Sequence, residues 1–551
     1  IEEIAASEAA HRPPVVTARR VAVTAARTVG WLLGPLLLMA AVLFLFRPAI
    51  VDGMIYYRPD TFLYYFPLAD RFVDVLHQGR LMLWTPYLFG GFPLFADGEV
   101  GMLYPPNVLA DMLLPSETAA FIWLAVARYL MGGFFTYCYL RSLRLNGFAA
   151  TIGALSFSLG SFTIAQMAHT NVVTTAIWLP LTLAFVELAV RNTRRKRWIY
   201  ATLAGTSTGI QALGLHIQPL IMSGFFLAFY VPFRVLLCPL AWPGSEEGEK
   251  SGARKPRHPG EGRDPASPVS GSDVDPGCRV KPGMTVGEAG MTVGEAGMTV
   301  GDTGTTEAAR LTAGRGGIKT GAPGMTVGGA GTTASVLATA AGRARRVLHW
   351  TGLHAAGTFH RMVLAGLLLA AIPAVAFGIA AAQVIPLVEL GMFSTRGQGV
   401  SYQFSTSFSL PVQNLVELIF PYFFRFTNQQ YYWSLWSEWE CALYVGIAPL
   451  ALAAVALLFA RRRLVLFFAA MAALSLVLAF GGYSPYPLWD QIRGLPGFSS
   501  LRVPARFTMI VTFCLAVLAA FGTDWLCRNL VPSRATAEGR WRRLSRFAGT
   551  Q

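Results

Sequence analysis

The sequence is poor in charged residues. Aspartate, glutamate, lysine and arginine together make up only 14% of the 551 residues, whereas 54% are hydrophobic. Several apolar runs approach the roughly 20 residues that a helix needs to cross the hydrocarbon layer of a membrane. This composition excludes an ordinary soluble protein. We therefore expect an all-α, polytopic integral membrane protein.

Cysteine and the common cofactor motifs are also scarce. The six cysteines are scattered, with no CxxC pair and no Cys/His spacing of the kind that binds zinc. The sequence contains no Walker loop, no GxGxxG turn and no HExxH helix. These absences leave ATP-driven and zinc-dependent chemistry without support.

Basic residues outnumber acidic residues, 45 to 30, for a formal net charge of +15. The excess lies mostly in short clusters between apolar runs, such as RNTRRKR at 191–197 and the arginines at 461–463. No nucleic-acid recognition motif accompanies them. Clusters of this kind mark the cytoplasmic side of membrane proteins, so the charge indicates topology and predicts no nucleic-acid partner.

Ten apolar segments are candidate crossings. They lie at 29–46, 118–140, 148–166, 172–190, 198–214, 217–238, 362–386, 441–460, 464–481 and 507–526. About ten crossings place every short basic cluster on the side of the N-terminus, as the positive-inside rule requires. The N-terminus and the basic clusters are then cytoplasmic, and the aromatic loops at 47–117, 387–440 and 482–506 face outward.

The same pattern divides the chain into parts. A basic N-terminal segment (1–28) precedes the first group of spans (29–238), and a second group (362–526) precedes a cytoplasmic tail (527–551). Between the two groups lies an insert, 239–361, that includes GMTVGEA-like repeats rich in glycine. Two or three glycines per repeat oppose a stable helix, so we predict a disordered cytoplasmic insert.

The first outer loop contains an amphipathic helix in our interpretation. Apolar side chains recur at helical spacing on one face: Phe62, Leu63, Phe66, Ala69, Phe72, Val73 and Leu76. Asp70, Asp74 and Gln78 fall on the other face, which is typical of a helix that lies at a membrane interface. Asp60 stands at its start. This carboxylate is an N-cap, a reactive group facing the outer compartment, or both, because capping does not exclude chemistry.

Polar residues also occur in the short outer turns and within one span. His169 lies in the turn between the third and fourth spans, while His216 and Gln218 lie between the fifth and sixth. Each is either a satisfied turn residue or part of a site. Arg128 falls inside the second span, where a charge usually pairs with another group or faces a cavity.

Further charges lie in the later outer loops: Arg396, Glu440, Arg502 and Arg506. Arginine binds phosphate oxygens well, although the last two arginines could instead snorkel to the interface. A carboxylate together with arginines close to lipid suits a reaction on a lipid-linked phosphate. The arginines would neutralise the phosphate leaving group, and the carboxylate would take a proton from an attacking hydroxyl.

An ordered series of motifs resembles a known family. After Asp60 come LWTPYLFGGFPL (83–94), LYPPN (103–107), LGLHIQP (213–219), QVIPLVEL with STR (383–396), ECALYVGIAPL (440–450) and LRVPARF (501–507). This series resembles the bacterial YfhO-like membrane proteins, which are grouped with the GT-C glycosyltransferases. The resemblance implies a GT-C-like fold in the bacterial inner membrane. It also implies further spans beyond Gln551, so we expect the chain to be truncated.

The resemblance further implies an enzyme that transfers a sugar from a polyprenyl-phosphate donor to a cell-envelope acceptor at the outer face. Asp60 matches the catalytic acid of the first outer loop, and we interpret it as the general base. Arg396, Arg502 and Arg506 are the expected phosphate binders, with His169, His216, Gln218 and Glu440 lining the site. Many GT-C enzymes carry a paired acid that Asp60 lacks, which leaves a divalent metal requirement open.

Two other interpretations stay open. A non-catalytic transporter or export factor for a lipid-linked glycan would use the same arginines without needing Asp60. Such a protein should show inverted repeats, and none is evident in the sequence. The chain could also be an inactive remnant, because it carries the insert and ends early.

Overall fold

The computed structural model describes residues 32–54, 60–214, 216–238, 330–397, 399–425, 432–495 and 497–530. The chain divides into two units, Ile1–Trp242 with Thr351–Gln551, and Pro243–Trp350. The second unit is described only from Ala330, where a helix begins. The predicted N-terminal segment 1–28, insert residues 239–329 and most of the predicted tail lie outside the described residues.

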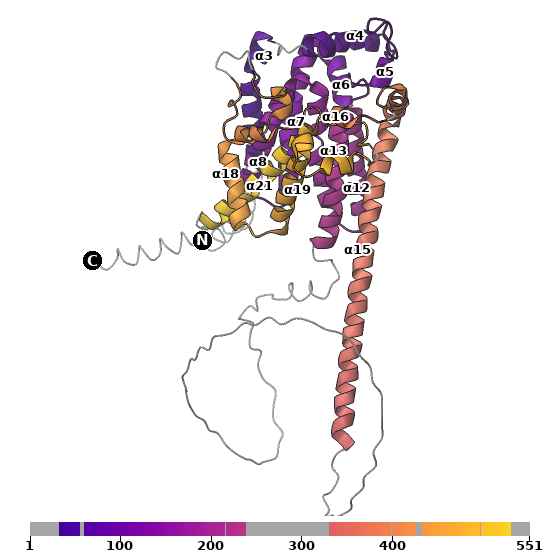
Figure 1. The fold of residues 1–551 in the computed structure, drawn as a ribbon, viewed down its shortest axis with the longest axis vertical. Coiled ribbons are helices and arrows are strands. Elements are labelled where there is room, and N and C mark those ends of the chain that lie inside the picture. The colour runs from indigo at the N-terminus through magenta and orange to yellow at the C-terminus, as the bar shows by residue number, and fades with distance from the viewer. Residues whose placement is uncertain are drawn as a thin grey trace, which may run out of the picture. The chain divides into compact units, whose positions relative to one another are not determined.

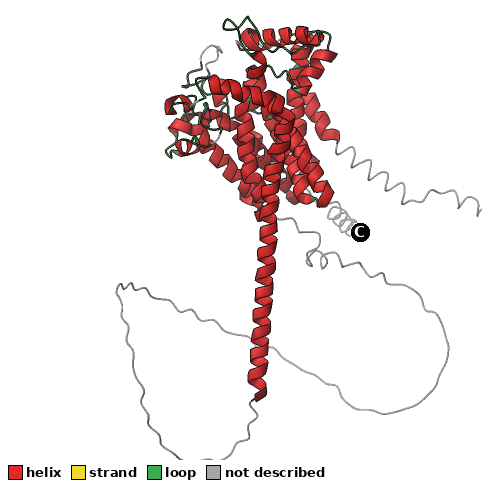
Figure 2. Ribbon diagram, turned by 90° about the vertical axis from the view of Figure 1, so that its right-hand side faces the viewer, coloured by secondary structure: helices red, strands yellow, loops and turns green. Residues whose placement is uncertain are grey.

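The described part of the chain is helical throughout, with loops and no named strand (Figure 2). Two isolated bridges, Thr85 with Phe92 and Arg425 with Tyr432, close local turns. The all-α prediction is therefore confirmed for these residues.

Seven helical stretches in this part are long and apolar enough to cross a membrane. They are Glu117–Ser142, Gly147–Ala165, Thr170–Arg191, Ile217–Leu237, Gly357–Phe393, Arg463–Tyr483 and Pro504–Leu530. Each overlaps a predicted span. Several multi-turn apolar helices in one chain are what a polytopic membrane protein requires.

The other three predicted spans are also helical but differ in length or polarity. Leu32–Leu45 and Ile447–Phe459 (α18) are apolar and short. Helix α12 (Arg194–Leu213) has 20 residues, but it starts with the basic cluster and is not among the seven. The count of ten crossings stays a prediction.

Helix α21 (Thr508–Leu530) forms the centre of the bundle. Most of its side chains are buried, including Phe513, Val517 and Phe521. It lies among α8 (Gly147–Ser158), α18 and α19 (Arg463–Phe480), as Figure 1 shows. Small residues allow this close approach, as is usual where helices pack within a membrane.

Helix α15 (Ala330–Phe393) corrects the predicted extent of the insert. We predicted disorder over 239–361, but residues 330–361 are helical. The prediction rested on the glycine-rich repeats, and the last of these, GMTVGGA, ends at Ala330. The following sequence is rich in alanine and contains several arginines, and both residues favour a helix.

The helix predicted in the first outer loop is present, with a shift in the residues it buries. Thr61–Tyr65 forms a π-helical turn (η1) that continues as α4 (Phe66–His77). Because a π turn has a longer period than an α turn, it rotates Thr61 and Tyr65 inward and leaves Phe62 and Leu63 exposed. The predicted face is maintained further on, where Phe72 is buried.

Gly522 tests the packing of α21. A Cβ added there would lie 1.9 Å from the carbonyl oxygen of Leu452 on α18, so the two helices would have to separate. We expect Gly522→Ala to lower the free energy of unfolding by about 2 kcal/mol or more, measured by thermal unfolding in detergent. Gly224→Ala is the matched control, because nothing lies within 4 Å of its added Cβ. Equal stability of the two variants would contradict this packing.

Candidate functional site

The residues predicted from separate motifs come together around one cavity of about 480 Å³. Its lining includes Asp60, His169, His216, Gln218, Arg396, Arg502 and Arg506. Glu440 is buried and is held by the Arg506 guanidinium. The convergence on which the site prediction depended is therefore observed in the fold.

Breaks between helices place the first of these side chains. Asp60 directly precedes η1, and His169 lies between η2 (Gln166–Ala168) and α10 (Thr170–Ala176). His216 and Gln218 begin α13 (Ile217–Pro232), where the chain turns back from α12. Side chains at helix ends point out of the bundle more freely than those in mid-helix, so these short turns can supply polar groups to one site.

The later segments supply the basic side of the cavity. Arg396 follows α15, and Arg506 lies in the short 3₁₀ helix η6 (Pro504–Phe507). Val503 precedes η6 with φ 62°, a left-handed conformation that a β-branched residue rarely adopts. Gln218 supports this turn, because its Nε2 donates to the carbonyl oxygens of Arg502 at 2.8 Å and Val503 at 2.9 Å.

Glu440 and Arg506 form a bidentate ion pair. Arg506 donates from Nε to Glu440 Oε2 at 2.9 Å and from Nη2 to Oε1 at 2.6 Å. Burial alone would raise the pKa of Glu440, but the guanidinium outweighs burial and holds that pKa below its usual value. The pair joins α17 (Glu438–Cys441) to η6 and fixes the orientation of both side chains.

A hydrogen-bonded chain links this ion pair to Asp60. Gln166 donates from Nε2 to Glu440 Oε2 at 3.1 Å and to the Trp439 carbonyl at 2.9 Å. Its Oε1 lies 2.9 Å from His169 Nδ1, and His169 Nε2 lies 3.0 Å from Asp60 Oδ2. Asp60 makes no side-chain N-cap hydrogen bond, so the capping alternative is wrong.

The geometry of these hydrogen bonds determines which nitrogen of His169 carries a proton. Two acceptors hold the amide nitrogen of Gln166, so its oxygen faces His169 and Nδ1 of that ring is the donor. The contact between His169 Nε2 and Asp60 Oδ2 then requires a further proton between them. Without that proton, a carboxylate and a neutral imidazole face each other. The Asp60–His169 pair therefore shares one proton when this contact is formed, and it is a proton acceptor in the state without that proton.

His216 is held neutral beside the ion pair. Arg506 Nη1 lies 2.9 Å from His216 Nε2, and because a guanidinium only donates, that nitrogen must be the acceptor. Burial lowers the pKa of His216 well below its usual value, and the charge of Arg506 lowers it further. Burial also lowers the pKa of His169, although Glu440 and Asp60 partly oppose this effect.

Arg396 and Arg502 differ from Arg506 in their partners. Both guanidinium groups lie over the ring of Phe404, at 5.2 Å and 5.3 Å from its centroid. Among the described residues neither forms an ion pair. Burial, with the nearby charge of Arg396, lowers the pKa of Arg502. These two arginines are thus available to an anion, whereas Arg506 is already occupied.

The cavity also holds acids that the sequence analysis missed. Asp97 and Glu99 line it, and Tyr64 donates a hydrogen bond to Asp97 Oδ2 at 3.0 Å. Burial, then the charge of Asp97, raises the pKa of Glu99 to about 7. Both acids lie in the segment FADGEVG (95–101), which the sequence analysis did not single out. Two acids close together in a loop rich in aromatic residues were the sequence signal that could have identified this part of the site.

The cavity therefore contains both acidic and basic side chains. Its lining includes Asp60, Asp97 and Glu99 together with Arg396 and Arg502. Within the described ranges, no group of three or more His, Cys, Asp or Glu side chains is arranged to hold a metal ion. Such a cavity can bind an anionic group beside a proton acceptor.

Comparisons with protein-family models, with curated proteins and with solved structures gave no match for this chain.

His216 gives a test of this electrostatic arrangement. Its pKa in the folded state lies below the unfolded value of about 6.5, so the unfolded state binds more protons as the pH falls. Neutral His216 therefore contributes stability above about pH 6.5, and this contribution declines on acidification. We therefore expect the stability of His216→Gln, relative to that of the native chain, to increase as the pH falls from about 7.5 to about 5.5. A difference between their unfolding temperatures that does not change with pH would contradict a neutral, buried His216.

Proposed function

We propose that this chain is a membrane glycosyltransferase that transfers a sugar from a polyprenyl-phosphate donor to a cell-envelope acceptor. The observation that carries the proposal is the cavity in which a carboxylate–histidine pair stands with two arginines that have no ion-pair partner among the described residues. GT-C-like assembly and bacterial inner-membrane placement, with the site on the outer face, belong to the same proposal.

The arginines of the cavity support binding of the donor phosphate. When the bond between the sugar and the phosphate breaks, negative charge increases on the departing phosphate oxygens. Arg396 and Arg502 can donate to those oxygens, and this stabilisation grows as the charge develops. Phe404 holds both guanidinium groups by cation–π contact without consuming their charge.

The Asp60 carboxylate supports activation of the acceptor. The acceptor hydroxyl attacks the anomeric carbon, forming one carbon–oxygen bond while the bond to phosphate breaks. Asp60 takes the hydroxyl proton, which His169 Nε2 then shares. Arg506 has a positioning role, because it fixes Glu440 and through Gln166 the orientation of His169. This assignment removes Arg506 from the phosphate binders expected from the sequence.

Asp60→Asn tests the proton acceptor. The amide keeps the size of the side chain but cannot accept the proton, so we expect loss of at least about 100-fold in transfer. The measurement compares envelope glycans in a strain lacking this gene, complemented with the native or the variant chain at matched membrane abundance. Equal restoration by both chains would exclude a general base and favour the transporter, and restoration by neither would favour an inactive remnant.

Substitutions of Arg396 and Arg502 test phosphate binding separately from sugar transfer. We expect Arg396→Gln and Arg502→Gln each to weaken binding of a polyprenyl phosphate about tenfold, because each removes a charge-assisted contact. Binding is read as thermal stabilisation of purified protein across a lipid titration. Arg493→Gln is the control, since that arginine is already paired with Asp490. Asp60→Asn should bind the lipid normally, and equal losses in all four variants would contradict the assignment.

A further inference from the structure

A second cavity, of about 430 Å³, lies on the other side of η1 and α10. Its walls are almost entirely apolar and come from the helix Leu32–Leu45, α3 (Arg47–Asp52), α7 (Glu117–Ser142) and the turn before α10. Leu45 and Met54 line it and are themselves largely exposed, at 45% and 61%. Since exposed apolar side chains of a spanning bundle contact lipid, the cavity is accessible from the hydrocarbon.

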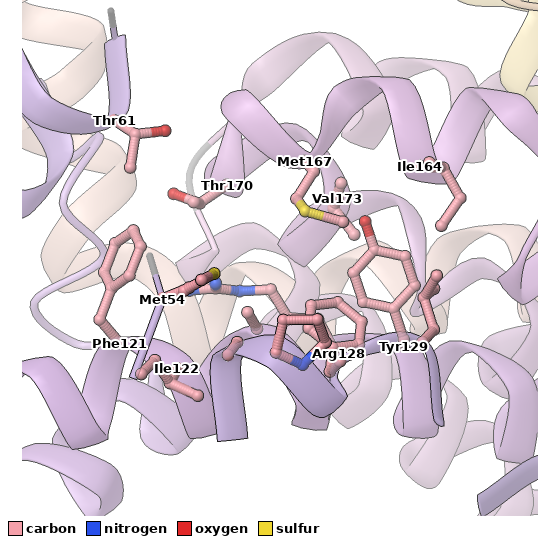
Figure 3. Close-up of a pocket in the computed structure, with 15 residues that line it drawn as sticks. Met54, Thr61, Phe121, Ile122, Arg128, Tyr129, Ile164, Met167, Thr170 and Val173 are labelled. Atoms are coloured by element: carbon pink, nitrogen blue, oxygen red, sulfur yellow. The ribbon is translucent and has the colours of Figure 1, made fainter. Parts of the chain in front are cut away.

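Arg128 is the one charged side chain in the lining of this apolar cavity. It is 7% exposed, and Figure 3 shows it extending from α7 into the cavity beside Met54. Its Nε has no hydrogen-bond partner, and no carboxylate among the described residues lies within ion-pair distance of it. The carboxylate of Asp111 shares the lining of a small neighbouring cavity with Arg128 but forms no ion pair with it. A buried cation without a paired counter-charge is costly, so this position favours a bound anion.

Thr61 provides a second unsatisfied group in the same lining. Its side chain is 2% exposed, and Oγ1 has no hydrogen-bond partner in the described structure. Thr61 lines the cavity together with Arg128, and both are labelled in Figure 3. Buried polar atoms are nearly always bonded, so two unpaired ones around one cavity indicate a ligand that bonds to both.

This cavity has a different lining from the first, and the small neighbouring cavity borders both, sharing Arg128 with the second and Glu99 with the first. None of the lining residues of the second cavity lines the cavity that holds Asp60. Neighbours in sequence face opposite ways: Asp60 and His169 line the first cavity, whereas Thr61 and Thr170 line the second. The Asp60–His169 contact therefore belongs to the wall between the two cavities.

We propose that the second cavity binds a membrane lipid with an anionic headgroup. The Arg128 guanidinium and the Thr61 hydroxyl contact the headgroup oxygens, and the apolar walls hold part of an acyl chain. The volume falls within the range of sites that enclose small organic ligands. This lipid is distinct from the sugar donor of the proposed function, and its binding does not depend on that function.

The test measures lipid binding to the full chain in detergent by native mass spectrometry and thermal unfolding. The probes are phosphatidylglycerol, phosphatidylcholine, a polyprenyl phosphate and inorganic phosphate. We expect phosphatidylglycerol to bind and stabilise the native chain, and Arg128→Gln to weaken that binding about tenfold or more. Thr61→Val should weaken it less. Arg80→Gln, which removes an exposed charge from the first outer loop, should leave binding unchanged.

Arg128→Met separates binding from folding. In the absence of anionic lipid, it should unfold at the same or a higher temperature than the native chain, because a buried charge without a partner is removed. It should no longer respond to phosphatidylglycerol. The proposal is overturned if Arg128→Met unfolds at a lower temperature without lipid, or if phosphatidylglycerol still stabilises it. Equal binding of phosphatidylcholine, or stabilisation by polyprenyl phosphate or inorganic phosphate but not by phosphatidylglycerol, would also overturn it.

Discussion

The ion pair between Glu440 and Arg506 is the contact on which the site depends. Glu440 is 4% exposed, and a carboxylate at that burial persists as a charge only if a fixed cation accompanies it. Its partner comes from a segment 66 residues further along the chain. From this pair, hydrogen bonds run through Gln166 to His169 and Asp60 on one side, and directly to His216 and Gln218 on the other. Separating the pair would therefore release both histidines and the turn that carries Arg502.

The pairing also divides the arginines by role. Arg506 is paired with a carboxylate inside the protein, so it orders the site, and its charge is not available to a ligand. Arg396 and Arg502 are held by an aromatic ring, which leaves their charge available to an anion. Arg128 lies in an apolar setting instead, where we propose that the headgroup of a lipid in the adjoining cavity accompanies it. The two proposed anion sites thus differ in character, and of the residues adjacent in sequence, Asp60 and His169 line the first cavity while Thr61 and Thr170 line the second.

Much of the fold follows from local pattern. Apolar runs predicted the spanning helices, and the breaks between them placed His169 and His216 at helix ends, because polar residues within an apolar chain mark its turns. The features that could not be predicted from the sequence depend on the three-dimensional structure. The π turn at Thr61 breaks the spacing on which the predicted stripe relied, and α15 begins earlier because glycine content changes at Ala330. The proton shared by Asp60 and His169 follows from the orientation of Gln166, and the raised pKa of Glu99 follows from its burial. Neither property is visible in a linear sequence.

A double-mutant cycle on Glu440 and Arg506 tests the central contact most directly. The free energies of unfolding of Glu440→Gln, Arg506→Gln and the double variant are compared with that of the native chain in one detergent. Each single change leaves a buried charge without its partner, so each should cost about 3–5 kcal/mol, whereas the double variant should cost much less than their sum. Additive losses would show that the two side chains do not interact, and the site would then lack the contact that assembles it.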